Sequence, residues 1–78
     1  MPKAFVFINT QRGCEATVLK KLKKVEGVDE AFVVYGVYDI IAKLKAKTIN
    51  KLKETITLRI RRLDKVRSTL TMMILEQL

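Results

Sequence analysis

The chain has 78 residues and a formal net charge of +8, with sixteen Lys and Arg against eight Asp and Glu. A chain of this length forms one domain, over residues 1–78, and buries only about 60–65% of its unfolded surface, so its core is thin. The single cysteine excludes an internal disulfide and fits a reducing compartment, while no apolar run approaches the roughly 20 residues that cross a bilayer. The N-terminus shows no signal-peptide pattern, so we expect a soluble cytoplasmic protein that gains stability by self-association.

The N-terminal half predicts a strand, a helix and a second strand. Residues 3–10 (KAFVFINT) are rich in Phe, Val and Ile and run into a polar loop, as a strand does. From Cys14 the apolar residues follow a helical period, with one face formed by Val18, Leu22 and Val25. Gly27 supplies a helix-ending residue, and residues 28–35 form the second strand.

The C-terminal half predicts a hairpin, a second helix and a last strand. A third strand is expected over residues 39–46, and only a few residues around Gly36 separate it from the second, so the two form a hairpin. Thr48 is a suitable N-cap for the second helix, whose apolar stripe is Ile49, Leu52, Ile56 and Leu63. Residues 66–75 form the fourth strand.

The two halves of the chain repeat one unit. Residues 22–28 (LKKVEGV) reappear thirty-eight positions later as residues 60–66 (IRRLDKV), matching in residue type except at the glycine. Two right-handed crossovers that share one antiparallel sheet give an α+β fold, the ferredoxin-like βαββαβ plait.

The strands are too apolar for a sheet with one side in water. Both helices of a plait lie on one face, so the strands of a monomer would alternate between apolar and polar residues. Residues 4–8, 31–35 and 70–75 are instead apolar at both parities. A second copy, related by two-fold symmetry, is the simplest cover for such a face. The expected dimer interface is Phe5, Phe7, Phe32, Val34, Met72 and Ile74; a monomer whose strand ends bury unevenly is the alternative.

The predicted topology brings three loops to one end of the sheet: residues 9–13, 35–39 and 65–68. Backbone N–H groups at the Gly36 turn and at the start of the first helix can hold a carboxylate, and Asp39 can accept hydrogen bonds from an ammonium group. Such a set suits an amino acid, which carries both charges. Structural explanations are also open: Gly36 can supply a positive φ, Asp39 can accept backbone N–H bonds, and Tyr38 can be a packing residue.

Gly36-Val37-Tyr38-Asp39 matches the GxYD turn of the effector-binding (RAM) domain of the Lrp/AsnC, or feast/famine, regulators. Residues 27–31 (GVDEA) and 63–71 (LDKVRSTLT) agree with it, and the resemblance extends from Ala4 to about Ile74. The resemblance implies an αβ sandwich that dimerises through its sheets, assembles further into oligomers such as an octamer, and binds an amino acid where dimers meet. The ligand-binding residues that it implies are Gly36, Val37, Tyr38, Asp39, Arg67, Ser68, Thr69 and Thr71.

The family's regulators carry an N-terminal helix-turn-helix that reads DNA, whereas here the first strand begins at once after Met1-Pro2-Lys3. The chain therefore resembles the stand-alone form of the domain. This implies an amino-acid-sensing and oligomerisation subunit in transcription regulation, which co-assembles with or modulates an Lrp/AsnC-type paralogue. We expect no sequence-specific DNA binding by the chain itself, no membrane partner and no cofactor.

A basic nucleic-acid-binding plait is the main alternative, because the same fold hosts RNA-binding domains and the charge is suitable. Such domains stack bases on aromatic residues of the middle strands, which residues 39–44 (DIIAKL) lack. Contact with the backbone alone would use Lys43, Lys45, Lys47, Lys51, Arg59, Arg61 and Arg62. A metal carrier would need a CxxC pair and an enzyme a nucleophile with its base, but Cys14 is alone and the chain has no His. We therefore expect neither a metal site nor an enzyme.

Overall fold

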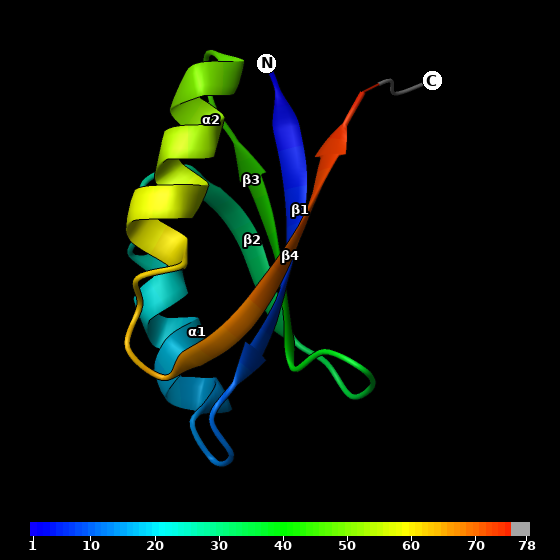
Figure 1. The fold of residues 1–78 in the computed structure, drawn as a ribbon, viewed down its shortest axis with the longest axis vertical. Coiled ribbons are helices and arrows are strands. Elements are labelled where there is room, and N and C mark those ends of the chain that lie inside the picture. The colour runs from blue at the N-terminus through cyan, green and yellow to red at the C-terminus, as the bar shows by residue number, and fades with distance from the viewer. Residues whose placement is uncertain (76–78) are drawn as a thin grey trace.

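Two layers make up the structure: a four-stranded antiparallel sheet and a helix layer on one of its faces (Figure 1). The computed structural model describes residues 1–75. The strands are β1 (Lys3–Thr10), β2 (Val28–Val33), β3 (Ile40–Lys45) and β4 (Val66–Ile74). The helices are α1 (Glu15–Lys23) and α2 (Ile49–Thr55), and α2 continues as the π-helical segment η1 (Ile56–Ile60). The predicted ferredoxin-like βαββαβ plait is confirmed.

The strand order is β2-β3-β1-β4, and every neighbouring pair is antiparallel. The helix α1 leads back from the end of β1 to the start of β2, and α2 with η1 leads back from β3 to β4, so the two helices run in opposite directions (Figure 1). The loops after β1, after β2 and before β4 therefore share one end of the sheet, here called the turn end. The loops after α1 and after β3 lie at the opposite end.

The core lies between the helices and the inner face of the sheet. Its fully buried side chains come from alternate positions of the two central strands and from one stripe of each helix: Ala4, Val6, Ile8, Ile40, Ala42, Leu44, Val18, Leu22, Leu52 and Ile60. Ile49 was expected in the buried stripe of α2, but it is 54% exposed. It is the first residue of α2, where a helical side chain leans toward the N-terminus and away from the turns that pack on the sheet.

The repeated sequence unit ends both helices in the same way. Corresponding backbone groups form i to i−3 hydrogen bonds of 3.0 and 3.2 Å after α1 and of 3.2 and 3.3 Å after η1. Gly27 and Lys65, the pair at which the two repeats differ, both have a positive φ, 100° and 73° respectively. The second half therefore keeps the backbone of the first although a lysine replaces the glycine.

The hairpin and the second helix differ most from the sequence prediction, while the ends of β3 and β4 differ by one residue. The strand β2 ends at Val33 and β3 begins at Ile40, so the hairpin loop covers residues 34–39 and is longer than expected. In η1 the N–H of Arg61 bonds the carbonyl of Ile56 at 3.0 Å, an i to i−5 bond that widens the helix by one residue. Within residues 1–75, no helix combines the length and the apolar character that a membrane crossing requires.

Candidate functional site

Three chain segments meet at the turn end, as the topology predicts. The carboxylate of Asp39 accepts a hydrogen bond from the backbone N–H of Thr10 at 2.9 Å and a longer one from the Thr10 hydroxyl at 3.5 Å. On the other side, the N–H of Gln11 donates to the carbonyl of Lys65 at 2.9 Å. The end of β1 is therefore connected by hydrogen bonds both to the β2–β3 loop and to the loop before β4.

Asp39 ties the hairpin loop to β1. The strands β1 and β3 pair only as far as Ile8 opposite Ile40, so the backbone of Thr10 extends past the ladder and the Asp39 side chain occupies the place of a further strand residue. Thr10 is 4% exposed, so its N–H needs this acceptor. Both bonds use Oδ2, which leaves Oδ1 without a hydrogen bond from the described part of the chain.

The tip of the loop projects away from the sheet (Figure 1). Tyr35 and Val37 are exposed almost completely. Gly36 does not have a positive φ, and a Cβ added to it would meet no atom within 4 Å. The turn-conformation explanation for Gly36 is therefore wrong, because the chain's own backbone does not require a glycine there. The absence of a side chain at Gly36 instead leaves open space beside the loop, outside the chain.

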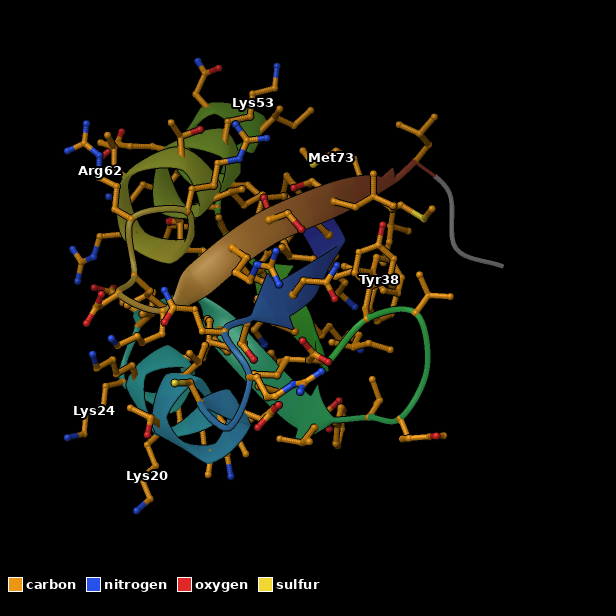
Figure 2. The ribbon with its side chains drawn as sticks, turned by 60° about the horizontal axis from the view of Figure 1, so that its bottom comes forward. Lys20, Lys24, Tyr38, Lys53, Arg62 and Met73 are labelled. Carbon is orange, nitrogen blue, oxygen red and sulfur yellow. The ribbon has the colours of Figure 1, made fainter. Side chains whose placement is uncertain are left out.

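Tyr38 connects the loop to the outer face of the sheet. Its ring packs on that of Phe7, with ring centres 5.6 Å apart and planes tilted by 46°. In Figure 2, Tyr38 lies between the projecting loop and the sheet. A displacement of the loop would therefore also move the Tyr38 ring against Phe7 on the outer face.

The predicted ligand residues of β4 lie on different faces of the sheet. Ser68 lies opposite Asn9, whose side-chain amide donates to its hydroxyl at 3.3 Å. Thr69 and Thr71 lie opposite β1 residues that are fully buried under the helices. The Thr69 hydroxyl accepts a hydrogen bond from Nε of Arg61 at 3.3 Å. The Thr71 hydroxyl is buried and has no partner among residues 1–75.

A shallow hollow of about 300 Å³ lies at the start of β4 and is lined by Arg61, Val66, Arg67, Ser68 and Thr69. The β2–β3 loop lies across the sheet from it, because β3 and β1 separate β2 from β4. One copy of the chain thus brings most of the predicted residues to the same end in two groups, Gly36–Asp39 on one side and Arg67, Ser68 and Thr69 on the other, while Thr71 lies farther along β4, opposite Val6. Sequence reasoning missed Thr10, Asn9 and Arg61, which hold these groups in place.

A larger hollow of about 690 Å³ lies at the opposite end, lined by residues 26–29, residues 45–48, Met1 and side chains of α2 and η1. Two ion pairs, Lys45 with Asp29 and Lys51 with Glu54, each at 3.8 Å, use four of its charged groups. None of the predicted ligand residues lies there, so the candidate site remains at the turn end.

The outer face of the sheet carries an apolar surface. The register aligns one row across all four strands: Phe32, Ile41, Phe7 and Leu70. Phe5 and Met72 are neighbours in the next row, and Ile74 ends the row beyond. Met72 is 53% exposed and Phe5 36%, although both are apolar. Five of the six predicted interface residues thus share this face, and Val34 lies just past the end of β2. Ile41 and Leu70 were missed, although Leu70 has the parity of Met72.

The Lrp/AsnC ligand binding domain family model matches residues 3–78. Among solved structures, FFRP-DM1 is 39% identical and superposes with a TM-score of 0.92, covering 96% of this chain and 100% of that one. AsnC of E. coli is 26% identical with a TM-score of 0.90, covering 97% of this chain and 52% of AsnC. A homocitrate synthase of Saccharolobus solfataricus is 39% identical over 62 residues, which are 80% of this chain and 13% of the synthase. The chain thus spans a small part of the curated relatives that it matches.

Proposed function

Because the chain belongs to the Lrp/AsnC ligand binding domain family, we propose that it is a regulatory effector-sensing domain that binds an amino acid at the turn end and responds through its state of assembly. The effector would contact Gly36, Val37, Tyr38 and Asp39 of one copy and the start of β4, with Arg67 and Ser68, of another. The separation of these two groups within one copy supports a site completed by a neighbouring one.

The observation that carries this proposal is the clear space beside Gly36. A residue other than glycine would fit the backbone of this loop without a clash. A glycine that the chain's own fold does not need is explained if another molecule approaches the backbone closely at this point. Close approach to a backbone is what binding through main-chain N–H groups requires.

The chemistry of the loop suits an amino acid. The N–H groups of residues 35–38 make no hydrogen bond within the described part of the chain, so they are available to a carboxylate. The Oδ1 atom of Asp39 is the matching acceptor for an ammonium group. A zwitterion would bind both the N–H groups and the Asp39 carboxylate, whereas a ligand with a negative charge alone would be repelled by Asp39.

We further propose that two copies pair through the outer faces of their sheets. The row that contains Phe7 supplies the apolar surface, and the Tyr38 ring extends it to the loop. This contact would couple effector binding to assembly. An effector shifts the assembly equilibrium only by the difference between its affinities for the two states, so it must contact a neighbouring copy to act in this way.

Calorimetry with each of the twenty amino acids, combined with light scattering, tests the proposal. We expect one chemical class to bind and to change the mass of the particle. Gly36→Ala is the sharpest variant, because it should leave the free energy of unfolding and the dimer unchanged while it removes the binding heat. Binding that is unchanged in Gly36→Ala, or the absence of binding by every amino acid, would contradict the proposal.

Asp39→Asn separates the ligand role of Asp39 from its structural role. The amide oxygen of asparagine can still accept the Thr10 N–H, so the loop stays attached to β1, but the negative charge is lost. We expect the fold to be kept and the affinity for the amino acid to fall about tenfold or more, since a hydrogen bond to a charged group contributes about 1.5–3 kcal/mol. Unchanged affinity would remove Asp39 from the site.

The comparisons support two settings for such a domain. The similarity to AsnC favours transcription regulation by co-assembly with an Lrp/AsnC-type regulator in the cytoplasm, in oligomers larger than a dimer. The similarity to a segment of homocitrate synthase favours the control of a biosynthetic enzyme. Mixed particles of the chain with a regulator of this family, detected by native mass spectrometry, would support the first setting, and a failure to mix would contradict it.

A further inference from the structure

The helix layer carries most of the positive charge of the chain. Residues 14–27 and 48–65, which form the helices and their ends, contain ten of the sixteen Lys and Arg and four of the eight Asp and Glu. These segments therefore carry a net charge of +6, ten cations against four anions, and the rest of the chain carries +2. The charge is concentrated on one of the two layers.

All ten of these cations are exposed, and five of them are here called the basic helix face: Lys20, Lys23, Lys24, Lys53 and Arg62. Figure 2 shows Lys20, Lys24 and Arg62 on the side of the helices that faces away from the sheet. None of the five forms a salt bridge with a described residue, since the ion pairs within residues 1–75 are those of Lys45 and Lys51. The positive potential of this face is thus left largely uncompensated.

The fold explains only part of this charge. Lys20 and Lys23 lie in the last turn of α1, where a cation stabilises the helix by about 0.3–1 kcal/mol. Arg62 lies after the end of η1, and Lys24 after the end of α1. Because the two helices run in opposite directions, these basic ends lie at opposite ends of the layer. The charge therefore extends along the molecule, whose longest extent is 34 Å.

We propose that the basic helix face binds the phosphate backbone of double-stranded nucleic acid without reading its sequence. A duplex is a rigid polyanion with one charge per about 1.7 Å of its axis, so it can engage cations spread over a face of this length at once. Lysine side chains contact phosphates as flexible point charges, which positions a protein on a duplex but selects no base.

The distribution of aromatic residues argues against single strands as the partner. Single-stranded nucleic acid is held by stacking its bases on aromatic side chains. All five aromatic residues of the chain, Phe5, Phe7, Phe32, Tyr35 and Tyr38, lie in the sheet or in the loop after β2. The helix layer has none, so it can offer charge but no stacking. This inference uses a different face from the proposed effector site and does not depend on it.

Fluorescence anisotropy with labelled duplexes of two unrelated sequences tests the proposal, with the full chain as it is. If the five cations each neutralise one phosphate, affinity should fall about 500-fold between 50 and 200 mM salt, and equally for both sequences. In the double variant Lys24→Gln with Arg62→Gln, the same change of salt should reduce affinity only about 40-fold, because two phosphate contacts are lost.

The matched control is Arg12→Gln with Lys47→Gln, which removes the same two residue types, both exposed, outside the basic helix face. It should keep the salt dependence of the unmodified chain. Double-stranded RNA bound with the same salt dependence supports a backbone contact. The proposal is overturned if the control weakens binding as much as the face variant, if a single strand binds more tightly than the duplex, or if no duplex binds at 50 mM salt.

Discussion

Met72→Ser should weaken the proposed sheet-to-sheet dimer while the single copy stays folded. Burying a methionine side chain completely contributes about 1.5–3 kcal/mol, and Met72 is 53% exposed in one copy, so about half of that remains to be gained in a dimer. The change occurs in both copies, which gives about 1.6–3.2 kcal/mol per dimer, or a dissociation constant raised about 15- to 200-fold. The direct cost to one copy is about 0.7–1.4 kcal/mol, because the other half of the side chain is already buried there.

Ile49→Ser is the matched control, because Ile49 is 54% exposed but lies at the start of α2, on the other layer. Sedimentation equilibrium over a range of concentrations measures both dissociation constants, and thermal unfolding at high dilution checks each fold. The reasoning would be refuted if both substitutions shifted the equilibrium equally, since that would mean loss of apolar surface anywhere has the same effect. A single monomeric species of the unmodified chain at every concentration would refute it as well.

Three further substitutions test local features by chemical denaturation. Lys65→Gly should stabilise the chain by about 0.5–1 kcal/mol, because Lys65 has the positive φ that Gly27 adopts at no steric cost; a loss of stability would show that the lysine side chain makes a stronger contribution elsewhere. Thr71→Val should add about 1 kcal/mol by removing a buried hydroxyl without a described partner, and a destabilised variant would mean that the hydroxyl is in fact satisfied. Asp39→Ala should cost about 1–3 kcal/mol, because the buried Thr10 N–H loses its acceptor, and no cost would mean that water replaces the carboxylate readily.

The sequence was sufficient to predict the fold because its signals are local and agree with one another. The limits of β1 and the start of β4 were predicted to the residue, and Thr48 caps α2 by accepting the N–H of Lys51 at 3.0 Å. The widened turn of η1 was not predicted, because a single i to i−5 bond leaves the apolar pattern of Leu52, Ile56 and Ile60 almost unchanged.

For the candidate site, the sequence could predict only the end of the sheet at which it lies. Topology alone brings the GxYD turn and the start of β4 to the same end of the sheet, but the face that each β4 side chain occupies depends on register, which the sequence did not supply. Ser68 and Thr71 differ in parity, so alternation puts them on opposite faces, but only the register with β1 shows that Thr71 is the one under the helices. The role of Asp39 in holding Thr10 depends on where the β1–β3 ladder stops, which no local pattern reveals.

The positive φ of Lys65 shows at which end of the sheet the backbone of this small protein is strained. The corresponding position of the first half is a glycine, which adopts the same conformation without crowding, at the end of the sheet that has no proposed ligand. The lysine lies at the turn end, and its carbonyl accepts a hydrogen bond from Gln11. Conformational strain of about 1–3 kcal/mol is common where a protein binds its ligands. The first half of the repeat thus has a glycine in this left-handed conformation, and the second half has a strained lysine at the end where we propose that the effector binds.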